Sequence, residues 1–298
     1  MSASEDHEAS RHRFGLKLQI TKMFAGGMIV TVKNPSQACI AEAYGARALI
    51  AIEQSGDAGG GGGMGMMGMG MGGGGGGGSG TTSDLQVIKN VMDRVMVPVI
   101  VRVRMGHELE AQVMEEAHVD MIDECELLMD TGMGQINKRP FQIPFMGEAA
   151  TLQEALKRIK GGCSIIRTRY SGSEDNADIK TTVDMVRAFM AEIQKLRVKN
   201  EIQKINYART EDVSIDLVNM VARSGALPVP FYAAGGIFMP IDVALLMRLG
   251  CNGVVVSSRI FTIMSPESRL QAIADAIANH KTPAKLTGLI EWTGGQGT

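Results

Sequence analysis

Short apolar runs rich in β-branched residues recur along the chain, and amphipathic stretches lie between them. Runs of four to eight such residues, bounded by turn residues, indicate buried β-strands. Eight runs fit this description: GMIVTV from Gly27, ALIAIE from Ala48, VPVIVRVR from Val97, VDMIDE from Val119, FQIPFM from Phe141, SIIRTR from Ser164, PVPFYAAGG from Pro228 and GVVVSS from Gly253.

The stretches between these runs have the spacing of amphipathic helices, and several open with Asn, Ser, Thr or Asp as helix N-caps do. Examples are PSQACIAEAYG, DLQVIKNVMDRV, GHELEAQVMEEA and TLQEALKRI. Strict alternation of strand and helix predicts an α/β protein with a parallel sheet, and eight units favour a single closed (β/α)8 TIM barrel. An open doubly wound sheet is the alternative. It is disfavoured because VTVKNPSQ, without a GxGxxG motif, follows the first predicted strand.

Two arginines interrupt the third run, which reads VPVIVRVRMGH from Val97 to His107. Side chains alternate along a strand, so Arg102 and Arg104 are expected on the same face. If that face is the inside of a barrel, the two cations need a ligand, an anion or a carboxylate partner.

Further polar residues stand at the carboxyl ends of the predicted strands, where the site residues of this fold gather. Two interpretations stay open: a binding site, or ion pairs at the rim in which Asp123 and Glu126 neutralise Arg102 and Arg167. Glycines near the seventh strand and serines after the eighth are typical of an anion cradle. The end residues are Thr31, Glu53, Arg102, Arg104, Asp123, Glu124, Glu126, Arg167, Arg169, Gly235, Gly236, Ser257 and Ser258.

Composition narrows the function classes. The chain has 298 residues, 45% hydrophobic and 21% charged, with a net charge of -2, so nothing global favours nucleic acid or an anionic membrane. The four cysteines lack the spacing of a zinc site or a disulfide framework, and no cofactor is indicated. The N-terminal sequence lacks a secretory apolar region, and no apolar run suits a membrane span, so a cytoplasmic protein is expected.

One segment breaks the barrel pattern: residues 59–80 read GGGGGMGMMGMGMGGGGGGGSG. Glycine loses the most backbone entropy on ordering, so the segment is expected to be disordered. Binding of Cu(I) by its methionines is a weaker alternative to an inert low-complexity expansion. We therefore expect a polar segment at 1–17, a barrel at 18–285 that contains this insert, and a short tail at 286–298.

Five stretches in order along the chain resemble one known family. They are GGMIVTVKNPSQACIAEAYGA, VPVIVRVRMGHELEAQV, VDMIDECELL, INKRPFQIPF and LPVPFYAAGGIFMPIDVALLMRLGCNGVVVSSRIF. The family is PdxS/SNZ, the synthase subunit of glutamine-dependent pyridoxal 5′-phosphate synthase. The resemblance implies a (β/α)8 barrel that self-associates into hexameric or dodecameric rings, with a PdxT-type glutaminase partner that supplies ammonia.

The resemblance also implies chemistry that this chain departs from. The family holds sugar-phosphate intermediates as imines on two lysines, and Arg102 and Arg169 stand at those two positions. Thr31 stands at the position of a family aspartate. The glycine-rich phosphate loop after the sixth strand is replaced by residues 170–175, which include Glu174 and Asp175. Because a guanidinium stays protonated at physiological pH, it cannot form an imine.

Other family site positions keep their residues. These are Asp123, Glu124, Glu126, Arg167, Gly235, Gly236, and Lys157 with Arg158 in the region of the family's second phosphate site. The candidate phosphate-binding residues are Gly235, Gly236, Ser257, Ser258, Lys157, Arg158 and Arg167. Retention of the family residues indicates either a retained ligand or an interior whose charges must balance.

Three functions are weighed. The first is a non-catalytic paralogue acting as a structural or regulatory partner of an active PdxS-type subunit in vitamin B6 biosynthesis. The second is an active synthase that uses other lysines, of which Lys33 and Lys138 lie near strand ends. The third is a sugar-phosphate or nucleotide binding protein with Arg102, Arg104, Arg167 and Arg169 as an anion clamp.

Overall fold

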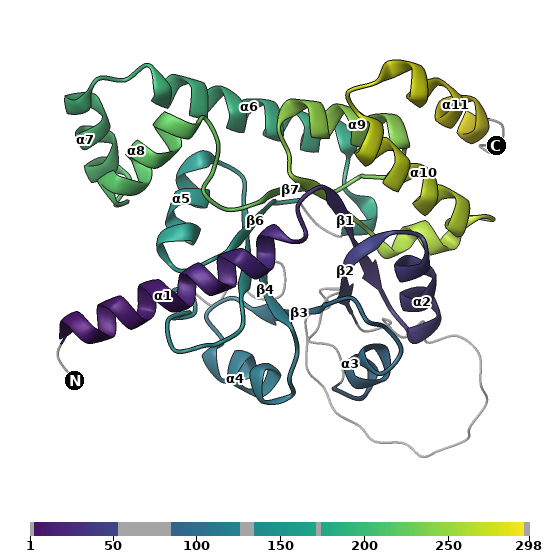
Figure 1. Cartoon of the computed structure of the whole chain (residues 1–298), viewed down its shortest axis with the longest axis horizontal. Coiled ribbons are helices and arrows are strands. Elements are labelled where there is room, and N and C mark those ends of the chain that lie inside the picture. The colour runs from purple at the N-terminus through teal and green to yellow at the C-terminus, as the bar shows by residue number, and fades with distance from the viewer. Residues whose placement is uncertain (1–2, 53–84, 126–133, 171–173, 295–298) are drawn as a thin grey trace, which may run out of the picture.

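The structure is a computed structural model that describes residues 3–52, 85–125, 134–170 and 174–294. Its centre is a closed barrel of eight parallel strands in the order of the sequence, so the predicted fold is confirmed (Figure 1). The strands are β1 (Gly27–Val32), β2 (Ala46–Ala51), β3 (Val99–Arg104), β4 (Met121–Cys125), β5 (Phe145–Ala149), β6 (Ile165–Thr168), β7 (Phe231–Ala234) and β8 (Gly253–Val256).

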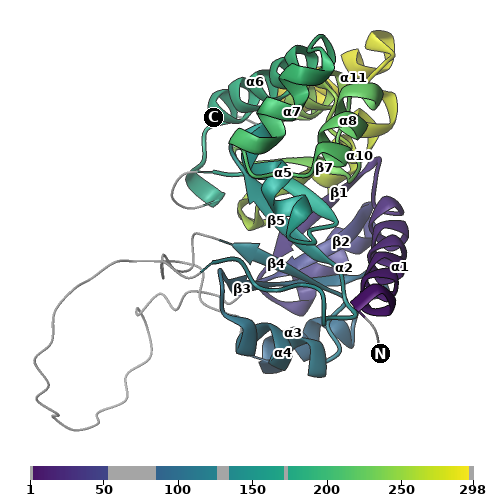
Figure 2. The same cartoon turned by 90° about the vertical axis from the view of Figure 1, so that its left-hand side faces the viewer.

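Helices surround the strands (Figures 1 and 2). The predicted helical stretches form α2 to α5, and side-chain N-caps open α2, α4 and α5. The helices are α1 (Ala3–Lys22), α2 (Pro35–Ala43), α3 (Leu85–Met92), α4 (Glu108–Glu116), α5 (Leu152–Lys160), α6 (Ile179–Arg197), α7 (Glu201–Thr210), α8 (Ile215–Ser224), α9 (Pro240–Leu249), α10 (Pro266–Asn279) and α11 (Pro283–Gly294), with short 3-10 turns η2 (Glu174–Asn176) and η3 (Ser258–Thr262).

Two apolar clusters stabilise the barrel. The larger lies between the strands and the surrounding helices. The smaller fills the barrel interior and includes Ile29, Ile100, Met146 and Tyr232. Phe24 joins this inner cluster, and its carbonyl accepts a hydrogen bond from the Tyr232 hydroxyl at 2.6 Å, so the turn after α1 closes the end where the strands begin. Within the barrel, the opposite end remains for charged side chains.

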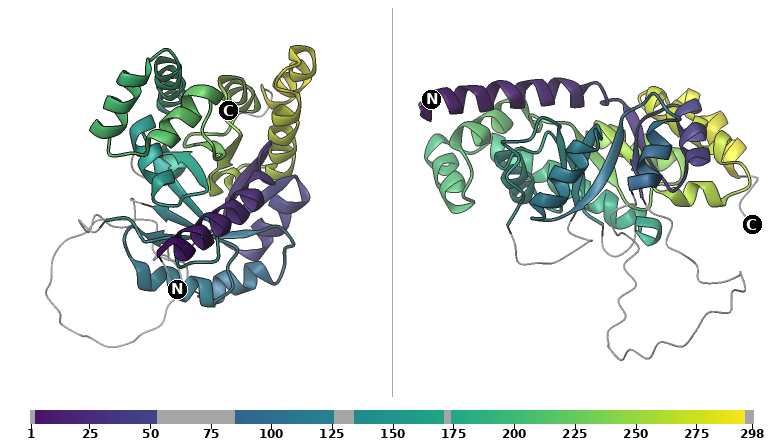
Figure 3. Two further views of the ribbon diagram at one scale, coloured as in Figure 1. Left: turned by 60° about the vertical axis from the view of Figure 1, so that its left-hand side comes forward. Right: turned by 90° about the horizontal axis from the view of Figure 1, so that it is seen from below.

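The α1 helix lies across the end of the barrel where the strands begin (Figures 1 and 3). Its Thr21 hydroxyl donates to the Ser164 carbonyl just before β6, at 3.0 Å. Lys17 is buried and donates to the Lys138 carbonyl, and burial lowers the pKa of this lysine to about 8. These contacts join the start of the chain to the outside of β4 to β6.

One predicted strand is displaced. The sequence pattern placed the fifth strand from Phe141 to Met146, whereas β5 begins at Phe145. Pro144 has no N–H to give to a strand ladder, and the N–H groups of Gln142 and Ile143 donate instead to Glu115 on α4. The shift brings Glu148 into the strand. The insert predicted at 59–80 lies outside the described residues.

Candidate functional site

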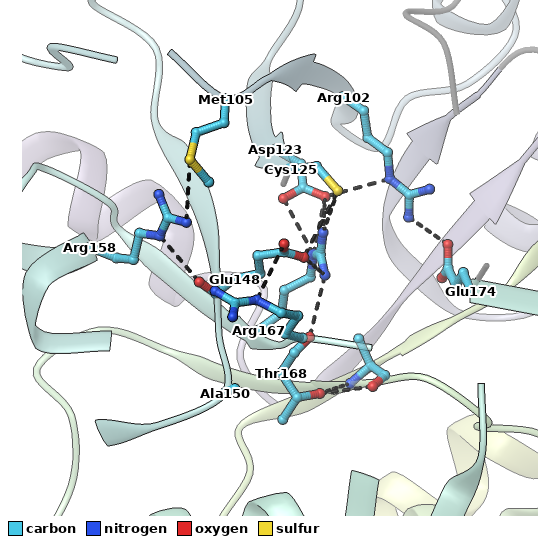
Figure 4. A network of polar contacts seen from close by, with 12 residues as sticks. Arg102, Met105, Asp123, Cys125, Glu148, Ala150, Arg158, Arg167, Thr168 and Glu174 are labelled. Atoms are coloured by element: carbon cyan, nitrogen blue, oxygen red, sulfur yellow. Dashed lines mark hydrogen bonds and ion pairs between the residues drawn. The ribbon is translucent and has the colours of Figure 1, made fainter. Parts of the chain in front are cut away.

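A layer of charged side chains lies above the apolar interior of the barrel, toward the carboxyl ends of the strands. Each comes from an inward position of its strand, because alternate residues of the same strands belong to the outer core. The layer holds Thr31 from β1, Arg102 from β3, Asp123 from β4, Glu148 from β5 and Arg167 from β6. All five side chains are buried. Figure 4 shows four of them converging, with Glu174 beside Arg102.

Arg167 occupies the centre of this layer with no exposed surface. Its Nη2 lies 3.1 Å from Asp123 Oδ2, and its Nη1 lies 2.8 Å from Glu148 Oε2. Burial disfavours the charged guanidinium, but Asp123 and Glu148 outweigh it and hold the pKa of Arg167 well above its ordinary value. Arg167 is thus a permanent cation between two carboxylates.

Arg102 is arranged in the same way. Its Nη2 donates to Glu174 Oε2 at 2.5 Å, and its Nε lies 3.6 Å from Asp123 Oδ2 (Figure 4). Burial opposes the charge here too, but Tyr170, Glu174 and Asp123 are among the groups that together raise the pKa of Arg102 above its ordinary value. A neutral guanidine is therefore even less accessible here than in water.

Arg169 lies at the rim and joins the same network. Its Nη2 lies 3.1 Å from Glu154 Oε2 on α5, and its Nε lies 3.6 Å from Glu148 Oε1. The side chains now form one line of alternating charge, which we call the charge chain. In order it runs Glu174, Arg102, Asp123, Arg167, Glu148, Arg169, Glu154. Each of its arginines stands between two carboxylates.

The turn η2 fills the mouth of the barrel above β1 and β3. The Glu174 carboxylate accepts hydrogen bonds from the Thr31 hydroxyl at 3.0 and 3.2 Å and is itself buried. Tyr170 is buried over Arg167, with the guanidinium carbon 5.1 Å from the ring centre. Glu174, which stands where the resemblance places the family's phosphate loop, therefore neutralises Arg102.

The glycines of the predicted anion cradle pack closely against the start of α6. Gly235 and Gly236 have φ of +103° and +69°, and a Cβ on Gly236 would lie 2.3 Å from the Ile179 nitrogen at the start of α6. Thr182 on α6 donates to the Gly235 carbonyl at 2.8 Å. Ser257 precedes η3 without a side-chain cap, and the buried Ser258 lies 3.5 Å from Asp175 Oδ1.

Lys157 and Arg158 lie elsewhere, on α5. They line a cavity of about 300 Å³ together with Met105, Gly134, Gln135, Glu154 and Arg169. Arg158 donates through Nε to the Glu148 carbonyl at 3.3 Å, and Lys157 lies 3.9 Å from Glu211. The candidate phosphate residues are thus split among the β7 and β8 mouth, the barrel interior and this side cavity.

Two expectations about individual side chains change. Arg104 does not share the interior with Arg102; its Nε lies 3.0 Å from Glu110 on α4, because β3 ends at this residue and its side chain turns over the rim. Glu124 faces the outer core, where it pairs with Lys138 and accepts from the N–H groups of Gly106 and Ile136. Glu53, Glu126 and residues 171–173 lie outside the described residues.

Sequence reasoning missed Glu148 and Glu154. The apolar pattern predicts a fifth strand at Phe141–Met146, which leaves Glu148 outside it; because β5 runs from Phe145 to Ala149, Glu148 takes an inward position. Glu154 sits in the first turn of α5, where the Thr151 cap accepts from its backbone N–H at 3.3 Å. Among the described residues, no group of three or more His, Cys, Asp or Glu side chains is arranged to hold a metal ion.

Comparison with known proteins identifies the family. The family model SOR/SNZ matches residues 72–234. Pyridoxal 5′-phosphate synthase subunit PdxS of Clostridium botulinum (strain Langeland) is 37% identical over 284 residues, 95% of this chain and 92% of the relative. The proteins of the same name from Haemophilus influenzae (strain PittGG) and Streptococcus pneumoniae (strain Hungary19A-6) are 37% identical over 283 residues, with the same coverage. The chain belongs to the SOR/SNZ family.

Among solved structures, a thiamine phosphate pyrophosphorylase from Pyrococcus furiosus is similar with a TM-score of 0.47 and 10% sequence identity, over 85% of this chain and 95% of that one. No functional argument follows from a likeness at this level. In the part of the chain that the structure describes, no helix has the length and apolar character needed to cross a bilayer.

Proposed function

We propose that this chain is a non-catalytic member of its family, a cytoplasmic protein that acts as a structural or regulatory partner in pyridoxal 5′-phosphate biosynthesis. One observation carries the proposal: the residues at the two family lysine positions are Arg102 and Arg169, and each is held between two carboxylates. The arginines keep the charge of the family lysines and lose their nucleophilic amine.

The chemical argument rests on protonation. An imine forms when a neutral amine attacks a sugar carbonyl, loses water and leaves a C=N bond. A guanidinium has no comparable neutral form near pH 7, and the pKa of Arg102 is raised further by its surroundings. The positive charge at these two positions therefore stabilises Asp123, Glu148, Glu154 and Glu174 rather than an intermediate.

The other lysines near the strand ends do not replace the lost pair. Lys138 is buried on the outer side of β4, where its ammonium pairs with Glu124 and lies 5.5 Å from the Phe145 ring centre. Lys33 follows β1 and lies 3.7 Å from Asp175. An active synthase with either lysine as its nucleophile is the alternative that the names of the relatives favour.

A synthesis assay separates these two functions. Purified chain is given ribose 5-phosphate, glyceraldehyde 3-phosphate and ammonium, and pyridoxal 5′-phosphate is measured by its absorbance; the PdxS subunit of Haemophilus influenzae is the positive control. We expect product from the relative and none from this chain. Product from this chain at a comparable rate would refute the proposal.

The partner role has its own test. The family resemblance implies rings, so this chain is expected to assemble with itself or with an active PdxS-type paralogue, and a PdxT-type glutaminase is a further candidate partner. Tagged chain is co-expressed with an active paralogue from the same organism and purified under native conditions. Mixed rings seen by native mass spectrometry support the role, whereas a monomer that captures neither protein contradicts it.

A sugar-phosphate binding protein is the second candidate, and the side cavity is the observation that favours it. The cavity is lined by Lys157, Arg158 and Arg169, with Glu154 among them. The four-arginine clamp is less favoured, because Arg102, Arg104 and Arg167 each pair with a carboxylate. Calorimetry with ribose 5-phosphate tests this function. Binding that Lys157→Ala abolishes would support it, and no heat of binding would exclude it.

A further inference from the structure

The barrel mouth is filled from within by two neighbouring carboxylates, Glu174 and Asp175. Glu174 is 7% exposed, although a glutamate is seldom buried without strong partners. Its partners come from two strands that are not neighbours in the barrel: the Thr31 hydroxyl from β1 and the Arg102 guanidinium from β3. A hydroxyl donor and a guanidinium that converge on one carboxylate are the groups with which proteins bind small carboxylates as ligands.

Asp175 fixes the next position of the same turn. Its Oδ2 lies 3.7 Å from the Lys33 ammonium after β1, and its carbonyl accepts from Arg259 Nη1 at 3.3 Å in η3 after β8. Ser258 Oγ lies 3.5 Å from Asp175 Oδ1. The turn is therefore fastened to the carboxyl ends of β1, β3 and β8 at once.

Both flanks of the turn are anchored as well. On one side, Tyr170 is buried against Arg167. On the other, the backbone of Asp178 and Ile179 packs on Gly236, and Thr182 donates to the Ala234 and Gly235 carbonyls. With both ends held, the Glu174 carboxylate reaches its donors at little cost in chain entropy.

We propose that Glu174 is a built-in ligand, and that the mouth of the barrel between Thr31 and Arg102 is a carboxylate-binding site that the chain itself occupies. The site holds a carboxylate whether or not the chain is an enzyme, so this proposal stands or falls separately from the proposed function. When Glu174 is shortened to alanine, the removed fragment has the size and charge of acetate, and free acetate takes its place.

The test is chemical rescue of Glu174→Ala. Without its carboxylate, the one carboxylate left near Arg102 among the described residues is Asp123, at 3.6 Å, and Thr31 loses the acceptor of its hydroxyl. We expect the melting temperature to fall by roughly 5–10 °C, the scale of a broken buried ion pair in a protein of this size. Sodium acetate should restore at least half of the loss, whereas sodium chloride at equal ionic strength and the bulkier benzoate should not.

Two further variants make the rescue specific. Asp184→Ala removes an exposed carboxylate on α6 that pairs with Lys180, so neither a large loss nor an acetate effect is expected. Glu174→Ala combined with Arg102→Met removes both the ligand and its cation, so acetate should no longer stabilise the protein.

If Glu174→Ala does not fold, the stability of Glu174→Gln tests the proposal in its place. The glutamine amide has the shape of the carboxylate and can accept a hydrogen bond from Thr31, but it lacks the charge. We therefore expect a smaller loss of stability than for Glu174→Ala. Acetate should have no effect, because the amide still fills the position of the carboxylate. Glu174→Ala or Glu174→Gln as stable as the unaltered protein would overturn the proposal. Equal stabilisation of Glu174→Ala and Asp184→Ala by acetate would overturn it too.

Discussion

The single carboxylate of Asp123 forms ion pairs with two arginines, Arg102 and Arg167. It lies 3.1 Å from Arg167 and 3.6 Å from Arg102 and has no exposed surface. A buried charge that loses its partner is far more costly than the pair is worth, because the remaining ion has no solvent to replace it. Removing the Asp123 carboxylate is therefore expected to lower the stability of the fold strongly. Replacing whole ion pairs of the charge chain with apolar groups need not destabilise the protein.

The change Asp123→Asn tests this at the residue scale. The amide is nearly the same shape but leaves two guanidinium groups short of a charge, so the free energy of unfolding should fall by about 3–5 kcal/mol. Asp184→Asn, on the exposed face of α6, should change it by about 0.5 kcal/mol or less. Urea denaturation measures both, and similar losses for the two variants would contradict the account.

The cations of this site are easier to predict from the sequence than their partners. Arg102 and Arg167 are evident because they interrupt apolar strands. Glu174 lies more than seventy positions from Arg102 in the chain, and only the fold brings the two together. Whether Glu148 faces the barrel interior depends on where β5 begins. The hydrogen bonds from the N–H groups of Gln142 and Ile143 to Glu115 keep these two residues out of the strand. Tertiary contacts of this kind leave no periodic signal in a sequence.

At the scale of elements, the packing of α6 on the turn after β7 decides what the barrel mouth contains. The N-terminus of α6 packs against Gly236, one of the residues of the predicted anion cradle. The strands themselves were predictable because buried parallel strands are continuous apolar runs. The filling of the mouth was not, because it depends on the path of residues 174–182.

Gly236→Ala probes this packing. The new Cβ would lie 2.3 Å from the Ile179 nitrogen, at a φ of +69°. Gly26→Ala is the matched control, since Gly26 has a φ of +78° and a Cβ added there would meet nothing within 4 Å. The control should cost about 1 kcal/mol of unfolding free energy for backbone strain alone, and Gly236→Ala roughly 3 kcal/mol or more. Equal costs would mean that α6 does not pack tightly on Gly236.

At the scale of the whole molecule, stability should depend on alkaline pH through three buried thiols. Burial raises the pKa of Cys125 and Cys163 from 9.0 to about 11, and that of Cys251 to about 12. Between pH 9 and 11 the unfolded chain loses these protons while the folded chain keeps them, so stability falls as pH rises. Lys17, with a pKa of about 8, has the opposite slope but is a single group. Burial also raises the pKa of Tyr207 from 10.0 to about 12, which adds to the fall in stability above pH 10.

We therefore expect the free energy of unfolding to fall by about 1 kcal/mol or more per pH unit across this window. Cys163→Ala should reduce the slope, whereas Cys39→Ala should leave it unchanged because Cys39 is exposed. Urea denaturation at a series of pH values gives both slopes. A stability that is flat or rising from pH 9 to 11 would show that the thiols do not govern it.

The central claim is that no amine at the third or sixth strand can hold a sugar as an imine, and borohydride trapping tests it most directly. The chain and the Haemophilus influenzae PdxS subunit are each incubated with ribose 5-phosphate and sodium borohydride, and their intact masses are measured. We expect the relative to gain a reduced sugar-phosphate adduct, and the Arg102→Lys variant of this chain to gain at most one such adduct. The unaltered chain should keep its mass. A stable adduct that peptide mapping places on a residue inside the barrel would contradict the account.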